Sequence, residues 1–227
     1  MGSDADSRQP YGADVEESAT PQEGASAAAT AVAVAPADTP TVVFIGTSLT
    51  AGYGLTPDRA YPAAVQRLAA ADNLPVRMVN AGLSGETSAG ALRRVEWVLR
   101  SPADVVVIET GANDGLRALD IDATRANITG IVQRIRRAQP AARVFLVQME
   151  APPNFGPDYT ARFRDMYPAI ARETGATLVP FLLEGVAAVP ELNQSDGIHP
   201  NIAGAERVAG TVWTALKPAV AALHAQR

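Results

Sequence analysis

The sequence predicts an α/β fold, a three-layer α/β/α sandwich in which a five-stranded parallel sheet lies between two layers of helices. From Thr41 onward, short β-branched runs alternate with longer amphipathic stretches, which is the pattern of a parallel sheet covered on both faces. The chain has 227 residues, of which 47% are hydrophobic and 19% are charged. A chain of this size and composition can bury one sizeable core, so we expect a single folded domain over residues 41–227.

The predicted elements follow from hydrophobic periodicity. Strands are expected where short apolar runs are rich in β-branched residues, at 42–46, 76–79, 104–109, 143–148 and 177–181. Apolar residues three or four positions apart predict helices between these strands, at 60–72, 88–100, 122–138 and 160–174. A last helix is expected over 202–223, with Asn201 as its N-cap.

Residues 1–40 differ in composition from the rest of the chain. They are rich in Ala, Ser, Pro, Gly and acidic residues and have no hydrophobic periodicity, so we expect a flexible N-terminal tail and linker. Met1-Gly2-Ser3 is typical of a start introduced by cloning. An acidic leader of this kind suits the mature form of an exported protein, periplasmic or derived from a lipoprotein, although a cytoplasmic protein with a disordered tail would have the same composition.

Composition also argues against several classes of function. The net charge of −5 and the lack of any basic cluster argue against a nucleic-acid partner, and the pairs Arg93-Arg94 and Arg136-Arg137 are interpreted as solvated helix faces. The absence of cysteine excludes disulfides, thiol nucleophiles and thiolate metal sites. His199 and His224 are far apart and form no His-Glu-x-x-His pattern, so we expect neither a metal nor another cofactor. No apolar run approaches the 18 or so residues that a transmembrane helix needs.

Polar residues follow the predicted strands where each strand ends. Ser48 follows the first strand, Gly85 the second and Asn113 the third, while Asp196 and His199 follow the last. Each has a simpler interpretation, as a helix cap or a turn residue. However, the carboxyl ends of parallel strands meet at one crevice, and a serine, a histidine and an aspartate are the parts of a nucleophilic hydrolase.

Four sequence blocks, together with their order and spacing, resemble a known family. Residues 46–54, 80–87, 111–115 and 196–200 resemble the signature blocks of the SGNH, or GDSL-type, hydrolases. Within that superfamily the chain is most similar to the bacterial arylesterase, thioesterase I and lysophospholipase L1 group. The resemblance covers residues 41–220, and 149–156 resembles the substrate-side loop of the group. It implies the flavodoxin-like fold of these hydrolases and hydrolysis of carboxylic esters through an acyl-enzyme.

The resemblance also implies roles for individual residues. Ser48 would be the nucleophile, His199 the general base and Asp196 the carboxylate that orients the base. The oxyanion hole would consist of the Ser48 and Gly85 backbone N–H groups and the Asn113 amide. A glycine at position 85 would let the backbone approach the oxyanion closely, because glycine has no Cβ.

The expected substrates are aryl esters or esters of short and medium acyl chains, with thioesters and lysophospholipids as further candidates. Tyr53, Pro153, Phe155 and Phe181 are expected to line the substrate crevice. The family usually has Asp immediately before its serine, whereas this chain has Thr47. A threonine supplies one hydroxyl where a carboxylate accepts several N–H bonds, so we expect the nucleophile loop to be held differently. In the second block, Glu86 replaces the more usual Asp.

Three alternatives remain open. A standard α/β-hydrolase needs a Gly-x-Ser-x-Gly elbow, which the chain lacks. A carbohydrate O-deacetylase of the same superfamily would need more aromatic residues for stacking on sugar rings. A non-catalytic, flavodoxin-like phosphate- or nucleotide-binding module would bind its ligand at residues 47–50, where a helix follows the first strand, but it would leave Asn113, Asp196 and His199 unexplained.

Overall fold

The computed structural model describes residues 38–227, so the tail predicted for residues 1–40 lies outside the described residues except for its last three positions. Five parallel strands form one sheet in the order β2-β1-β3-β4-β5. They are β1 (Thr41–Gly46), β2 (Arg77–Gly82), β3 (Val105–Ile108), β4 (Arg143–Val147) and β5 (Thr177–Val179). All five predicted strands are therefore confirmed, although β2 extends three residues beyond its predicted end.

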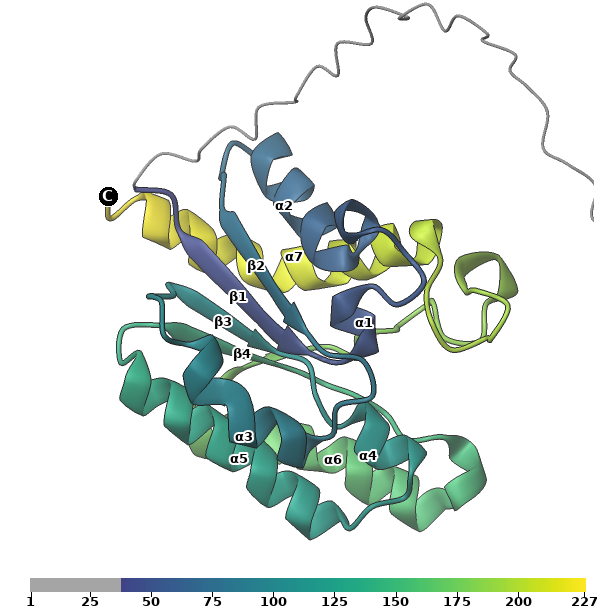
Figure 1. Ribbon diagram of the computed structural model, residues 1–227. Helices are drawn as coiled ribbons and strands as arrows, with labels where there is room; N and C mark the ends of the chain where they lie inside the picture. Colours follow the sequence, from purple (N-terminus) through teal and green to yellow (C-terminus); the bar gives the residue numbers. More distant parts are fainter. Residues whose placement is uncertain (1–37) are drawn as a thin grey trace, which may run out of the picture. The chain divides into compact units, whose positions relative to one another are not determined.

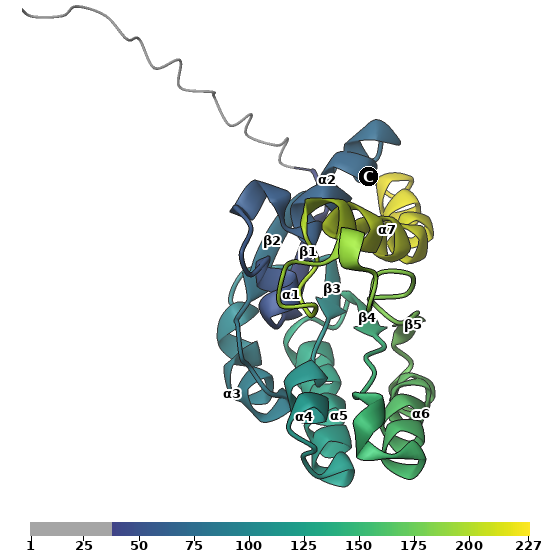
Figure 2. The same cartoon turned by 90° about the vertical axis from the view of Figure 1, so that its right-hand side faces the viewer.

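Helices cover both faces of the sheet (Figure 1). On one face, α2 (Tyr61–Ala71) packs against the long C-terminal helix α7 (Ile202–His224). On the other face, α5 (Ile121–Ala138) lies between α3 (Ser88–Val98) and α6 (Pro157–Thr174), and Figure 2 shows the same layers from the side. The predicted three-layer α/β/α sandwich is thus confirmed.

The two helical layers explain why the central strands are almost purely apolar. All four residues of β3 are completely buried, as are Phe44 and Ile45 of β1. A parallel strand with both faces covered has no reason to alternate polar and apolar residues. This continuous burial makes the centre of the sheet a rigid base for the loops that follow each strand.

Short elements connect several strands to the longer helices. Helix α1 (Ser48–Ala51) comes shortly after β1, and helix α4 (Ala112–Leu116) comes after the short loop that follows β3. Three 3-10 turns lie at Pro57–Arg59, Pro153–Phe155 and Pro190–Leu192. The sequence predicts a helix after the first strand, at α1. The other four elements were not predicted, because segments of three to five residues are too short to show a hydrophobic period. The predicted N-cap of α7 is present, since the Asn201 side chain accepts a hydrogen bond of 3.1 Å from the Gly204 N–H.

Strand β2 forms one edge of the sheet, and its outer side is closed in part by its own side chain. Leu83 donates its N–H to Gly46 of β1, so the neighbouring Gly82 N–H faces away from β1. This N–H donates to Asn80 Oδ1 at 2.9 Å instead, while Asn80 Nδ2 donates to the Thr50 carbonyl oxygen at 2.8 Å. The Asn80 side chain therefore connects the edge strand to α1.

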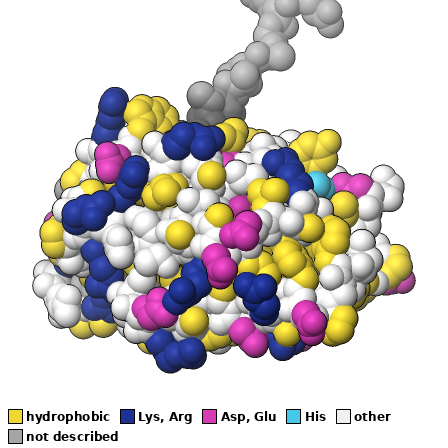
Figure 3. Space-filling view, turned by 90° about the horizontal axis from the view of Figure 1, so that it is seen from below, with side chains coloured by type: hydrophobic (Ala, Val, Ile, Leu, Met, Phe, Trp, Pro, Cys, Tyr) yellow, Lys and Arg dark blue, Asp and Glu magenta, His cyan; other side chains and the backbone are white. Residues whose placement is uncertain are grey.

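The surface shown in Figure 3 carries basic and acidic side chains that are interspersed rather than gathered by sign. Across residues 38–227, no helix is both long enough and apolar enough to span a bilayer.

Candidate active site

Ser48 and His199 meet at the carboxyl end of the sheet although they are 151 residues apart in the chain. Ser48 is the first residue of α1 and directly follows Thr47 at the end of β1. His199 Nε2 lies 2.9 Å from Ser48 Oγ, and His199 Nδ1 lies 2.7 Å from Asp196 Oδ2. The structure thus brings together the serine, histidine and aspartate that the sequence singled out, in the order that proton transfer requires.

Asp196 and His199 belong to one tight turn. Gly197 has a φ of +69°, which a glycine adopts without strain, and the turn places two backbone N–H groups against Asp196 Oδ1. The Ile198 N–H donates at 2.9 Å and the His199 N–H at 3.0 Å. The backbone and ring of His199, followed by the Ile198 N–H, lower the pKa of Asp196 to about 2. An ionised carboxylate at Nδ1 favours the tautomer with a proton on Nδ1, which leaves the Nε2 lone pair facing Ser48.

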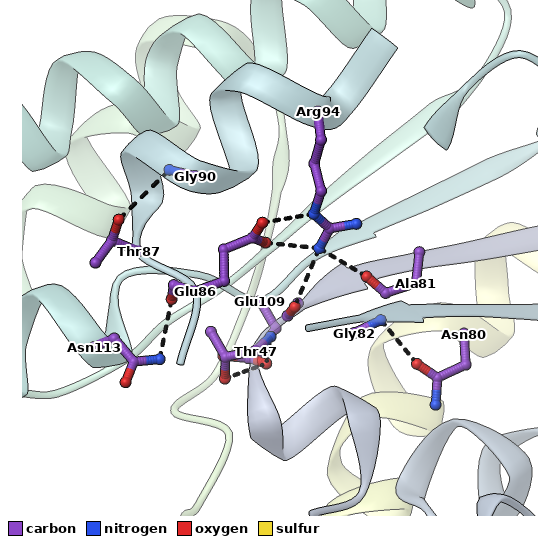
Figure 4. A network of polar contacts seen from close by, with 11 residues as sticks. Thr47, Asn80, Ala81, Gly82, Glu86, Thr87, Gly90, Arg94, Glu109 and Asn113 are labelled. Carbon is purple, nitrogen blue, oxygen red and sulfur yellow. Dashed lines mark hydrogen bonds and ion pairs between the residues drawn. The ribbon is translucent and has the colours of Figure 1, made fainter. Parts of the chain in front are cut away.

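Gly85 and Asn113 line the same cavity as Ser48 and His199. Gly85 has a φ of +76°, and a Cβ built on it would meet no atom within 4 Å. Its positive φ by itself favours a glycine at this position. Asn113 Nδ2 donates to the Glu86 carbonyl oxygen at 3.0 Å (Figure 4), which fixes the plane of the amide. The second hydrogen on Nδ2 is not used by this bond.

An ion pair beneath the loop of Gly85 was not predicted. The Glu86 carboxylate binds Arg94 twice, with Oε1–Nε and Oε2–Nη2 distances of 2.6 Å each (Figure 4). The Glu86 side chain is only 4% exposed. Arg94 Nη2 also donates to the carbonyl oxygens of Ala81 at 2.8 Å and Gly46 at 3.4 Å. The interpretation of Arg94 as a solvated helix residue is therefore wrong, because this arginine connects the ends of β1 and β2 to the loop of Gly85.

Two buried carboxylates near the site were also missed. Asp114 accepts hydrogen bonds from the Ser88 N–H at 2.8 Å and the Ser88 hydroxyl at 2.6 Å. These bonds tie α4 to the start of α3. Glu109 is completely buried at the end of β3 and accepts a bond of 2.8 Å from the Thr47 N–H. The available signal was a carboxylate directly after the wholly apolar run 105–108 in a predicted central strand.

A cleft of about 530 Å³ opens beside Ser48. Three of the four residues expected at a substrate crevice line this cleft: Tyr53, Pro153 and Phe181. Phe155 is not among the lining residues, and its ring packs edge-on against Tyr159 with 5.8 Å between ring centroids. The centroids of the Tyr53 and His199 rings are 4.6 Å apart. Met149, Ala151 and Pro152 also line the cleft and belong to the segment 149–156, whose sequence resembles a substrate-side loop. Further apolar lining residues were not predicted: Leu49, Ala112, Leu116, Leu183, Ala187 and Ile198.

Comparison with known proteins agrees with this geometry. The family model described as "GDSL-like Lipase/Acylhydrolase family" matches residues 44–207. Esterase TesA of Pseudomonas aeruginosa is 40% identical over 180 residues, which cover 78% of this chain and 88% of that protein. "Thioesterase 1/protease 1/lysophospholipase L1" of Escherichia coli K12 is 34% identical, covering 79% of this chain and 85% of that protein.

A solved structure gives the same result in three dimensions. The psychrotrophic esterase EstA from Pseudoalteromonas sp., in a structure described as inhibited by monoethylphosphonate, superposes with a TM-score of 0.75 at 32% identity. The match covers 79% of this chain and 98% of EstA. The resemblance inferred from the four sequence blocks is confirmed, and the chain belongs to the GDSL-like lipase/acylhydrolase family of SGNH hydrolases.

Proposed function

We propose that this chain is a serine esterase that hydrolyses carboxylic esters through an acyl-enzyme on Ser48. The observation that carries the proposal is the 2.9 Å contact between Ser48 Oγ and His199 Nε2, with Asp196 on the far side of the ring at 2.7 Å. A hydroxyl that contacts the unprotonated nitrogen of an oriented imidazole is an activated nucleophile.

The proposed reaction has two stages. Ser48 Oγ attacks the ester carbonyl carbon while His199 Nε2 takes the hydroxyl proton, and the Asp196 carboxylate stabilises the imidazolium. His199 then gives this proton to the leaving alcohol, and the C–O bond of the ester breaks. A water molecule, deprotonated by His199, attacks the acyl-enzyme in the same way and releases the acid.

The oxyanion of each tetrahedral intermediate would be stabilised by the Ser48 N–H, the Gly85 N–H and the Asn113 amide. Ser48 is the first residue of α1, so its N–H has no partner within that helix. The bond from Asn113 to the Glu86 carbonyl holds the amide in place before substrate binds. Donors fixed in advance stabilise developing charge without reorganisation, and each contributes about two to three orders of magnitude in turnover.

The cleft supports an apolar acyl or aryl group as the part of the substrate that is bound. Its volume of about 530 Å³ lies in the range of small-molecule sites, and its lining is mostly aliphatic and aromatic. We propose aryl esters and esters of short or medium acyl chains as substrates. The names of the related proteins make thioesters and lysophospholipids further candidates.

The test uses hydrolysis of p-nitrophenyl acetate, butyrate and octanoate by the wild type, Ser48→Ala and Ser101→Ala. Ser101 is exposed and is not among the residues that line the cleft, so it is a matched control for loss of a hydroxyl. We expect Ser48→Ala to abolish turnover and Ser101→Ala to retain it. A fluorophosphonate should add its mass to the wild type and to Ser101→Ala, and not to Ser48→Ala. A folded wild type that neither hydrolyses these esters nor takes up the phosphonate would contradict the proposal.

We further propose that the chain functions outside the cytoplasm. The support is the composition of residues 1–40, which suits the leader of an exported protein. Fractionation of the native cells, followed by immunodetection of the chain, tests this. Recovery with cytoplasmic marker proteins would contradict it.

A further inference from the structure

The carboxylate of Glu109 lies directly behind the nucleophile, and the reaction described above gives it no role. Glu109 directly follows the central strand β3, which pairs with β1, and its side chain is completely buried. Its hydrogen-bond partners are Thr47, which directly precedes Ser48, and Thr50, which follows Ser48 in helix α1. No basic side chain is among these partners.

In every one of these hydrogen bonds, the Glu109 carboxylate is the acceptor. The Thr47 N–H lies 2.8 Å from Oε2, and the Thr47 hydroxyl lies 3.0 Å from both carboxylate oxygens. The Thr47 hydroxyl oxygen also accepts the Leu49 N–H, so its own proton is available for Glu109. Thr50 Oγ1 donates to Oε2 at 2.9 Å. Thr50 Oγ1 also lies 2.8 Å from the Tyr61 hydroxyl, and because its own proton goes to Glu109, it accepts the proton of Tyr61.

The backbone of the turn is shaped around this carboxylate. A Cβ built on Gly46 would lie 2.7 Å from Glu109 Oε2 and 2.0 Å from Thr50 Oγ1. Both distances are too short for a real side chain, so only glycine lets the end of β1 approach the carboxylate this closely. This observation is independent of the hydrogen bonds and leads to the same residue.

We propose that Glu109 is a positioning residue for Ser48, which holds the turn of residues 46–50 through Thr47 and Thr50 so that the Ser48 hydroxyl meets His199. The inference rests on the proposed function. It also gives Thr47 a specific part, because a neutral donor at this position can bind a buried carboxylate. An aspartate there would place a second carboxylate against the first, and the two could not both be ionised without strong repulsion.

The hydrogen bonds by which Glu109 holds Thr47 and Thr50 should depend on pH. Burial raises the pKa of Glu109 to about 7, while hydrogen bonds from Thr47 and Thr50 act in the opposite direction. The titratable groups that face it are the phenols of Tyr61 from α2 and Tyr167 from α6. Burial above all raises the pKa of both phenols, so they stay neutral wherever Glu109 titrates. A protonated Glu109 must itself donate one hydrogen bond, and the present arrangement of donors around it is then lost.

The experiment compares Thr47→Val, Thr47→Ser and Glu109→Gln with the wild type. Valine keeps the shape of threonine and the bond from the backbone N–H of residue 47, and removes only the hydroxyl. We expect Thr47→Val to lower kcat for p-nitrophenyl butyrate by about 10-fold to 100-fold with KM within about twofold. In the pH profile of kcat for this variant, the fall in activity on the acid side, its acid limb, should move to higher pH. The reason is that loss of the hydrogen bond from residue 47 favours the protonated form of the Glu109 carboxyl. Thr47→Ser, which restores the hydroxyl, should return both properties to within about threefold of the wild type.

Glu109→Gln provides a second and independent test, because the amide imitates the protonated carboxyl. We expect it to lower kcat at every pH and to remove the part of the acid limb that the wild type shows near neutrality. Thr214→Val on the outer surface of α7 is the matched control, since its hydroxyl bonds a helix carbonyl far from the site. Thermal unfolding of each variant shows that it is folded.

The outcomes separate the two proposals. If Thr47→Val and Glu109→Gln are folded and keep the kcat and pH profile of the wild type, the positioning role is wrong while the esterase assignment stands. If they change only the melting temperature, Glu109 is a purely structural residue and the inference is again overturned. If the wild type takes up no phosphonate on Ser48, the proposed function fails and the positioning role fails with it.

Discussion

Asp196 contacts His199 twice, once at the ring nitrogen Nδ1 at 2.7 Å and once at the backbone nitrogen at 3.0 Å. One carboxylate therefore fixes both the position of the residue and the orientation of its ring. Because the two residues belong to the same turn, the acid and the base of the proposed triad move as a single unit. Only Ser48 has to be brought to them from another part of the chain.

Asp196→Asn should separate these two effects. The asparagine oxygen can still accept the two backbone N–H bonds, so we expect a folded protein with His199 in place. Its amide, however, would donate to Nδ1 and stabilise the wrong tautomer, and the same change in other triads costs about four orders of magnitude in kcat. Esterase rates and circular dichroism of this variant check the prediction. Turnover at the wild-type rate would remove Asp196 from the proposed triad.

The pKa of Asp196 also limits where acid inactivation can come from. Its hydrogen bonds lower the pKa from 3.8 to about 2, so the contribution of the carboxylate is present above its ordinary pKa and is lost only as the pH falls toward 2. Loss of activity between about pH 5 and 7 must therefore arise from other groups. We expect the Asp196→Asn profile, at its lower rate, to keep an acid limb in that range.

Asn113→Ala should lower kcat by about two to three orders of magnitude with little change in KM, because an oxyanion donor acts mainly in the transition state. Asn154→Ala, at an exposed position of the Pro153–Phe155 turn, is a matched control and should keep normal turnover. Steady-state kinetics with p-nitrophenyl butyrate distinguish the two. A large rise in KM at constant kcat would instead assign Asn113 to ground-state substrate binding.

Glu86 and Arg94 are expected to be strongly coupled. Removing Arg94 alone, as in Arg94→Met, leaves the Glu86 carboxylate buried without its partner, which typically destabilises a protein by about 3–5 kcal/mol. Arg93→Met on the same helix changes an exposed side chain and should alter stability by less than about 0.5 kcal/mol. Urea unfolding of Arg94→Met, Glu86→Gln and the double variant measures the coupling. Additive losses would show that the pair does not act as a unit.

The buried Glu109 carboxyl should make the free energy of unfolding depend on pH. Burial raises its pKa in the folded protein from 4.5 to about 7, so the folded state holds a proton that the unfolded state releases. The resulting stabilisation is fully present below pH 4.5 and is lost as the pH rises through 7, in total about 3 kcal/mol. Glu109→Gln cannot release this proton. Between pH 4.5 and 7, we therefore expect the free energy of unfolding of the wild type to fall relative to that of Glu109→Gln, as measured by urea unfolding at each pH.

Two glycines of α7 should respond in opposite ways to the same substitution. A Cβ on Gly210 would meet no atom within 4 Å, so Gly210→Ala should stabilise the helix by about 0.5–1 kcal/mol. A Cβ on Gly204 would lie 2.1 Å from the Leu192 carbonyl oxygen, so Gly204→Ala should lower the melting temperature. Thermal unfolding of both variants checks the pair. Equal shifts would mean that the loop of Leu192 moves away without cost.

The sequence predicts the parts of this structure that have a local cause. The strands follow from apolar runs. Ser48, Gly85 and Asn113 are found because they come shortly after strands, and His199 is found because an aspartate, Asp196, precedes it by three residues. Arg94 could not be placed, because its neighbour Arg93 has the same local pattern and only the fold decides which of them meets Glu86. Glu109 was hidden for a related reason, since its partners Thr47 and Thr50 are about 60 residues away and become neighbours only when β1 pairs with β3.

The Asn80 side chain on β2 has a consequence for how separate molecules meet. An open strand edge is a template on which a second chain can add a strand, and that is one route to aggregation. Here the outward Gly82 N–H is already bonded to Asn80, and the opposite edge, β5, is only three residues long. One donor of the β2 border is thus already taken and the β5 border is short, so each border offers a second chain fewer free backbone groups than a long, unoccupied strand would.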